Sequence, residues 1–124
     1  MILDSGALIA IDRNDRKMIA RLVVAYQNDD EIKTHPIVVA QVWRDGRGRQ
    51  AKLARALRGI DVVTIDTDLG KRCGELLGTA GSSDPIDAAV VLIARDGDTI
   101  LTSDDDDIRH LAAAAGRRVV VVHC

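Results

Sequence analysis

The sequence has few of the residues on which several classes of protein depend. Among its 124 residues there is no phenylalanine, one tyrosine and one tryptophan, which argues against a platform of stacked aromatic rings for single-stranded nucleic acid. Its two cysteines, Cys73 and Cys124, form no Cys-x-x-Cys pair, so neither a disulfide framework nor a zinc knuckle is indicated. No apolar run approaches the roughly 18 residues that span a bilayer, and residues 1–4 lack the pattern of a signal peptide. We therefore expect a cytoplasmic protein with reduced thiols and no membrane contact.

The composition is that of a globular chain whose charges are segregated. Hydrophobic residues make up 47% and charged residues 29%, which predicts a single domain over residues 1–124. The net charge is only −2, yet residues 44–58 carry six basic residues and one acid, and residues 84–107 carry eight acids and one base. This distribution suggests that the protein brings a polyanion to a site that holds a cation.

Short apolar strands alternate with amphipathic segments along the chain. A helix begins at Asn14 or Asp15 with an apolar face of Met18, Ile19, Leu22, Val23 and Tyr26. Further helices are expected from Pro36, from Arg49, from Asp66 or Thr67, from Asp84-Pro85, and from Ser103 or Asp104. Strands are expected at residues 1–3, 32–34, 61–65, 99–102 and 119–122. The alternation predicts an α/β fold with a parallel sheet covered on both faces, whose ligands bind beyond the carboxyl ends of the strands.

Several acids fall at that edge. Asp4 follows the first strand, Asp104 follows the strand at 99–102, and Asp84 and Asp87 stand in the first turn of a helix. Converging carboxylates repel one another unless a cation is present, and oxygen ligands suit Mg²⁺ and Mn²⁺. The sequence alone does not fix the strand order that would bring them together.

Each of these acids also has a structural explanation, because aspartate caps helix N-termini and complements the helix dipole. We accept that explanation for Asp66 and Asp68, and prefer it for Asp105 and Asp106. Four consecutive acids at 104–107 exceed what one cap needs, and Asp4 follows an apolar strand where an unpaired charge is costly. For Asp4, Asp87 and Asp104 we therefore favour a metal site.

Three segments resemble the motifs of PIN-domain ribonucleases, and most closely those of the VapC-type toxins of bacterial toxin–antitoxin pairs. They are Leu3-Asp4-Ser5-Gly6-Ala7-Leu8-Ile9, Asp84-Pro85-Ile86-Asp87-Ala88-Ala89, and Thr102-Ser103-Asp104 followed by Asp107-Ile108. The resemblance spans nearly the whole chain. It implies a three-layer α/β/α sandwich with a central parallel sheet, metal-dependent endoribonuclease activity with Mg²⁺ or Mn²⁺, a cognate antitoxin and a homodimer. It also implies metal-binding and catalytic roles for Asp4, Asp87 and Asp104, with Asp84 and Asp107 as supporting acids.

One position departs from the family pattern. The family usually has a glutamate in the helix after the second strand, where this chain has Gln41. An amide can ligate through its carbonyl oxygen, but it supplies no charge and cannot act as a base. The alternative hypothesis is therefore a catalytically weakened PIN-like module that binds RNA or a protein.

A basic stripe provides candidate contacts to nucleic acid. Arg49, Lys52, Arg55 and Arg58 recur every three residues, and Arg44 precedes them. We take Arg44, Arg49, Lys52 and Arg55 as the candidate phosphate-binding residues. A solvated charged face explains the same pattern, and the family resemblance also places antitoxin or protomer contacts in this region.

Other polar residues are interpreted as structural. Ser5 lacks an identified base and is interpreted as a helix cap, and the three histidines show no metal-ligand spacing, so capping or surface roles are expected for His35, His110 and His123. A phosphoacceptor receiver domain, with Asp66 at a strand end, needs a later lysine, and none follows Lys71. A dehalogenase-type phosphatase needs an acid where Gly6 stands. Both alternatives are weaker.

Overall fold

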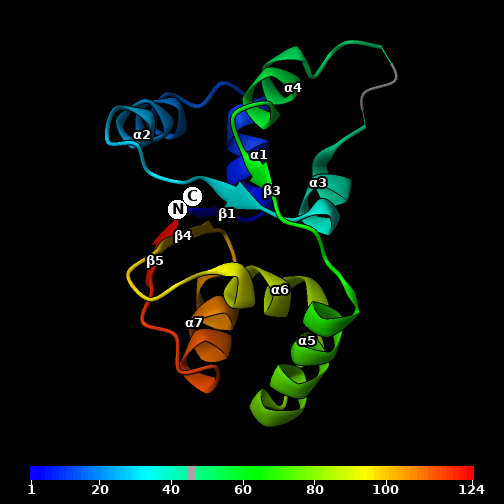
Figure 1. The fold of residues 1–124 in the computed structure, drawn as a ribbon. Helices are drawn as coiled ribbons and strands as arrows, with labels where there is room; N and C mark the ends of the chain where they lie inside the picture. The colour runs from blue at the N-terminus through cyan, green and yellow to red at the C-terminus, as the bar shows by residue number, and fades with distance from the viewer. Residues whose placement is uncertain (45–46) are drawn as a thin grey trace.

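The computed structural model describes residues 1–44 and 47–124, which form a parallel sheet between two layers of helices (Figure 1). The strand order is β3-β2-β1-β4-β5, with all neighbours parallel. The strands are β1 (Ile2–Leu3), β2 (Lys33–Thr34), β3 (Asp61–Val62), β4 (Thr99–Thr102) and β5 (Val120–His123). The first strand therefore lies beside the fourth, and their carboxyl ends meet at one edge.

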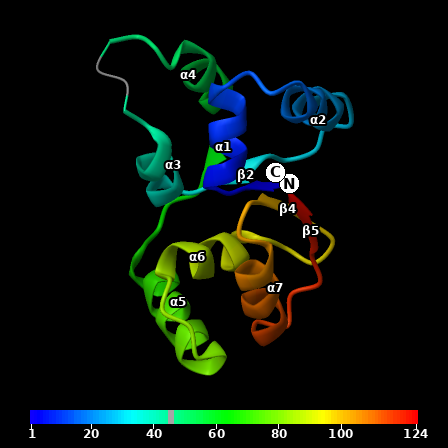
Figure 2. The same ribbon diagram turned by 180° about the vertical axis from the view of Figure 1, so that it is seen from behind.

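The helices divide between the two faces of the sheet, as both views show (Figures 1 and 2). One layer consists of α1 (Ser5–Asp12), α2 (Arg16–Gln27), α3 (Pro36–Val42) and α4 (Ala51–Leu57). The other consists of α5 (Thr67–Ala80), α6 (Pro85–Ile93) and α7 (Asp105–Ala114). The α/β/α three-layer fold predicted from the sequence is confirmed.

The core is centred on β1, β4 and α6. The side chains of Ile2, Leu3, Ile100 and Leu101 are fully buried. Complete burial of each such aliphatic side chain contributes about 1.5–3 kcal/mol. Helix α6 is apolar on nearly all sides and is almost entirely buried between the sheet, α5 and α7. The helix enters the interior within its first turn, where Pro85 is exposed and Asp87 is already buried.

Local signals in the sequence placed most element boundaries correctly. Strand β4 has the predicted bounds, and Pro36 and Pro85 each open a helix. The carboxylates of Asp15 and Asp66 accept hydrogen bonds from the backbone N–H groups of Met18 and Leu69, which confirms both as N-caps.

Three predictions were wrong or incomplete. Helix α1 was not predicted, and β3 is shorter than the expected strand at 61–65. Val23 and Tyr26, expected on the buried face of α2, are each 47% exposed. The buried face is formed by Met18, Leu22 and Ala25 instead, and the hydroxyl of Tyr26 lies against Gly59.

Among the described residues, no single helix is long and apolar enough to cross a membrane. Helices α5 and α6 taken together would be long and apolar enough, but their axes are bent by 108° relative to each other.

Candidate metal centre

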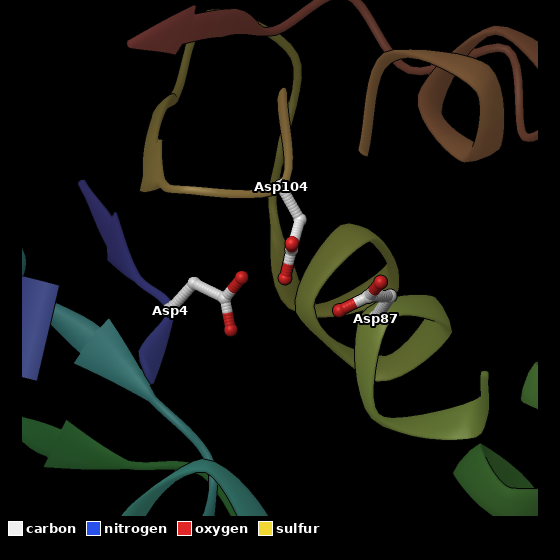
Figure 3. A group of neighbouring side chains, drawn as sticks. All are labelled: Asp4, Asp87 and Asp104. Atoms are coloured by element: carbon white, nitrogen blue, oxygen red, sulfur yellow. The ribbon is translucent and has the colours of Figure 1, made fainter. Parts of the chain in front are cut away.

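Three aspartates from separate parts of the sequence meet at the carboxyl edge of the sheet (Figure 3). Asp4 follows β1, Asp104 follows the adjacent strand β4, and Asp87 projects from the first turn of α6. One carboxylate oxygen from each lies within 4.8 Å of the others. The structure thus brings together the three residues that the sequence singled out.

The carboxylate of Asp4 is fixed by two hydrogen bonds. Oδ1 accepts from the backbone N–H of Ser5 at 2.8 Å, and Oδ2 accepts from the hydroxyl of Thr102 at 2.7 Å. The residue is 1% exposed, and it also serves as the N-cap of α1. Capping and membership of the cluster are therefore compatible at this position.

Asp104 has the position of a helix cap without the capping contact. It precedes α7, but its side chain makes no hydrogen bond to the N-terminus of that helix. Its backbone N–H donates to Oγ1 of Thr102 at 2.9 Å. Thr102 therefore links the main chain of Asp104 to the carboxylate of Asp4, and the carboxylate of Asp104 extends towards the other two (Figure 3).

Burial and the crowding of negative charge raise the pKa values of Asp87 and Asp104. Burial, followed by the charges of Asp84, Asp4, Asp104 and Asp107, raises the pKa of Asp87 to about 7. The pKa of Asp104 is also raised, first by burial and then by the neighbouring carboxylates. Carboxyl oxygens held this close in a partly buried site favour either a proton or a cation.

The supporting acids predicted from the sequence lie near this cluster. Asp84 caps α6, where one carboxylate oxygen accepts from the backbone N–H groups of Ile86 and Asp87. Asp107 is exposed in the first turn of α7. Both raise the pKa of Asp87, so their charges act on the cluster.

Gln41 stands on the exposed surface of α3, and within the described residues its side chain has no hydrogen-bond partner. It is therefore open to solvent and ligands.

His35 holds the backbone of Ile86, the residue before Asp87, and the sequence did not reveal this contact. Its ring is fully buried, and Nδ1 accepts hydrogen bonds from the backbone N–H groups of Ile37 and Val38. The ring proton therefore resides on Nε2, which donates to the carbonyl of Ile86 at 3.0 Å. Burial lowers the pKa of His35, outweighing the Ile86 hydrogen bond and the charge of Asp4, which act to raise it. Of the two roles expected for this histidine, capping or surface, the structure confirms capping, at a buried position.

The other histidines have structural contacts. Nε2 of His110 lies 2.7 Å from the carbonyl of Ala80, and Nδ1 of His123 lies 2.8 Å from Oδ1 of Asp105. Both are exposed, in agreement with the prediction.

Most of the basic stripe lies on or beside α4, in the helical layer formed by α1, α2, α3 and α4. Lys52 and Arg55 are exposed on α4, while Leu53 on the same helix is fully buried, as the pattern predicted. Arg49 is exposed just before α4. The guanidinium of Arg44 donates to the carbonyls of Ala40 and Trp43 at the end of α3. Helix α4 packs on α1, in the helical layer opposite to α6, which carries Asp87.

The donor set fits a divalent cation. Three carboxylate oxygens converge, two of the residues are buried, and the acids around them raise the local negative potential. Such all-oxygen sets suit Mg²⁺ or Mn²⁺, which usually retain several water ligands.

Comparison with solved structures identifies a similar fold. The chain superimposes with a TM-score of 0.72 on a chain in the crystal structure of VapBC2 from Rickettsia felis bound to a DNA fragment from their promoter. The match covers 99% of this chain and 97% of the other at 16% sequence identity. No family model matches the sequence, and no curated protein matches it.

Proposed function

We propose that this chain, whose fold is that of a VapC-like PIN domain, is a metal-dependent endoribonuclease and the toxin component of a toxin–antitoxin pair. The observation that carries the proposal is the convergence of Asp4, Asp87 and Asp104 at the carboxyl edge of the sheet. Parallel α/β proteins bind their ligands at this edge. The proposal treats residues 1–124 as a single PIN-like domain that acts in the cytoplasm.

The three aspartates would hold Mg²⁺ or Mn²⁺, with Asp84 and Asp107 adding charge that favours the cation. The bound cation supplies Lewis-acid chemistry: it lowers the pKa of a water ligand and neutralises charge that develops on phosphoryl oxygens. Thr102 and the N–H of Ser5 hold the Asp4 carboxylate in one orientation. No protein nucleophile is required.

The charge pattern and the fold support the proposed substrate and the proposed antitoxin partner. Arg44, Arg49, Lys52 and Arg55 would contact phosphates of the RNA outside the cleavage site, with an affinity that falls as salt increases. The similar chain belongs to a VapBC2 complex, which supports a cognate antitoxin as partner. We further propose that the toxin is a homodimer.

Cleavage of a mixed RNA substrate tests the proposal. The purified chain is assayed with Mg²⁺ or Mn²⁺, with EDTA, and as the Asp4→Asn, Asp87→Asn double variant. A matched control is Asp106→Asn, because Asp106 is fully exposed in the same acidic segment and lies outside the cluster. We expect metal-dependent cleavage by the wild type and the control, and none by the double variant. Cleavage that persists unchanged in the double variant would refute the assigned roles.

Gln41 favours the second candidate function, a PIN-like module that binds RNA or a protein with weakened turnover. The exposed amide adds no negative charge to the site. If this candidate is correct, the wild type binds RNA without cutting it, and Gln41→Glu gains metal-dependent cleavage. Full activity of the wild type, with no gain in Gln41→Glu, would exclude it.

A further inference from the structure

A second charged cavity lies at the opposite end of α6 from the aspartate cluster. It has a volume of about 420 Å³ and is formed by β2, the start of α5, the end of α6 and the segment after α7. Asp87 is at the start of α6 and Ile93, which lines the cavity, is at its end, about 9 Å along the helix axis. None of the three clustered aspartates lines this cavity. The two sites are therefore separate.

Cations outnumber acids around the cavity. Its wall contains four basic residues, Lys33, Arg72, Arg95 and Arg117, and three aspartates. Lys33 forms an ion pair with Glu31 at 3.5 Å, and Glu31 does not line the cavity. Within residues 1–44 and 47–124, the three arginines have no carboxylate within 4.0 Å. Three guanidinium groups that lack ion pairs thus share one concave surface.

One of these arginines also has an unsatisfied donor. Nε of Arg117 is buried and, among the described residues, has no hydrogen-bond partner. A buried N–H without an acceptor is unfavourable, and native proteins rarely leave one in that state. Arg117 also lines the cavity, so in the part of the chain that the structure describes no protein acceptor competes with an anion for its guanidinium group.

The acids in the wall restrict which anion can enter. Asp66 and Asp96 each use one carboxylate oxygen to accept a backbone N–H, from Leu69 and Arg118 respectively, and Asp68 lies beside Asp66. Their charges remain and would repel a long polyanion such as RNA. A small anion that places its charge at the arginines avoids this repulsion.

The rest of the wall is apolar. Val63, Leu69, Leu92 and Ile93 contribute side chains next to the charged groups. Ligand sites commonly combine such a surface with a few convergent polar groups, in volumes of about 300–1,000 Å³. The cavity therefore has room for an organic group as well as a phosphate.

We propose that this cavity binds a small phosphate ester of about mononucleotide size, with its phosphate at Arg72, Arg95 and Arg117 and its organic part against the apolar wall. Phosphate matches the planar donor geometry of guanidinium groups. This site is independent of the proposed nuclease function.

Calorimetric titration in EDTA tests the proposal with inorganic phosphate, AMP, adenosine and a short single-stranded RNA. We expect AMP and phosphate to bind and adenosine to fail, because the phosphate supplies the recognised charge. Arg117→Ala and Arg95→Ala should each weaken AMP binding about tenfold or more. Arg118→Ala is the matched control and should bind as the wild type does, since Arg118 is adjacent in sequence and exposed but does not line the cavity.

Other outcomes overturn the proposal. They are failure of both phosphate and AMP to bind, binding that survives the cavity variants, or binding of RNA alone. If Arg117→Ala does not fold, Arg72→Ala and Arg95→Ala at exposed positions provide the same comparison. Asp4→Asn should leave AMP binding intact, so failure of the nuclease proposal remains distinguishable.

Discussion

The hydroxyl of Thr102 donates a 2.7 Å hydrogen bond to Oδ2 of Asp4 across 98 positions of sequence. The same hydroxyl oxygen accepts the N–H of Asp104 at 2.9 Å. A single buried side chain therefore sets both the orientation of one carboxylate and the start of the segment that carries another. Because β1 and β4 are adjacent parallel strands, this link joins the two strand ends at the site.

Replacement of Thr102 tests how far the cluster depends on this link. Thr102→Val keeps the shape but leaves the Asp4 carboxylate and the Asp104 N–H without their partner, so we expect a loss of about 1–3 kcal/mol in unfolding free energy. Metal affinity should fall as well. Thr102→Ser retains the hydroxyl and should restore metal affinity at a cost of about 1 kcal/mol for the missing methyl group. Urea unfolding and Mn²⁺ titration measure both effects, and equal metal affinity in the Val and Ser variants would contradict the link.

Divalent metal should stabilise the folded chain. A cation that binds only the native state, at one hundred times its Kd, adds about 2.7 kcal/mol, which corresponds to roughly 10 °C in Tm for a domain of this size. We expect Mn²⁺ to raise the Tm of the wild type and of Asp106→Asn, and to have little effect on Asp4→Asn. Differential scanning fluorimetry with and without EDTA measures this. Equal Tm shifts in all three proteins would place the metal elsewhere.

Residues that act on near neighbours were predictable from the sequence, while those that act across the fold were not. Asp66 and Pro85 mark helix starts because capping and a fixed φ operate within a turn. Helix α1 was missed because Ser5–Asp12 is mostly apolar, without a clear polar face, and it is fixed by packing between other elements. Its burial is a property of the tertiary structure.

The candidate site shows the same division. The chemistry of Asp4, Asp87 and Asp104 could be recognised from their places after strands and in a first turn. Their convergence depends on β1 lying beside β4, and the strand order is not encoded locally. The contact between His35 and Ile86 joins residues 51 positions apart, so its role could only be found in the structure.

Loss of the proton from Asp87 should make the metal-free chain less stable as pH rises. The folded-state pKa is raised from 3.8 to about 7, so its contribution to stability is fully present below pH 4 and is lost as pH rises through 7. Relative to Asp87→Asn, the unfolding free energy of the wild type should fall by up to about 4 kcal/mol over this range. Urea unfolding in EDTA at several pH values gives the difference, in which the effects of the other titrating groups, including His35, largely cancel. A difference that is constant with pH would contradict the raised pKa of Asp87, which burial and then the neighbouring carboxylates produce.

Gly6 allows α1 to lie against the segment that carries Asp104. A Cβ at Gly6 would lie 2.7 Å from Oγ, 3.1 Å from Cβ and 3.2 Å from the backbone nitrogen of Ser103. Rotation of the Ser103 side chain relieves only the first contact, so Gly6→Ala should shift the main chain just before Asp104. We expect a loss of about 1–3 kcal/mol in stability and a marked loss of metal affinity.

The matched control is Gly74→Ala on α5, where an added Cβ meets no atom within 4 Å. There the gain in helix propensity should stabilise the chain by up to about 1 kcal/mol, with metal affinity unchanged. The double variant Gly6→Ala, Ser103→Gly removes two of the three contacts and should recover part of the metal affinity. If Gly6→Ala binds Mn²⁺ as tightly as Gly74→Ala does, the close approach of α1 does not position Asp104.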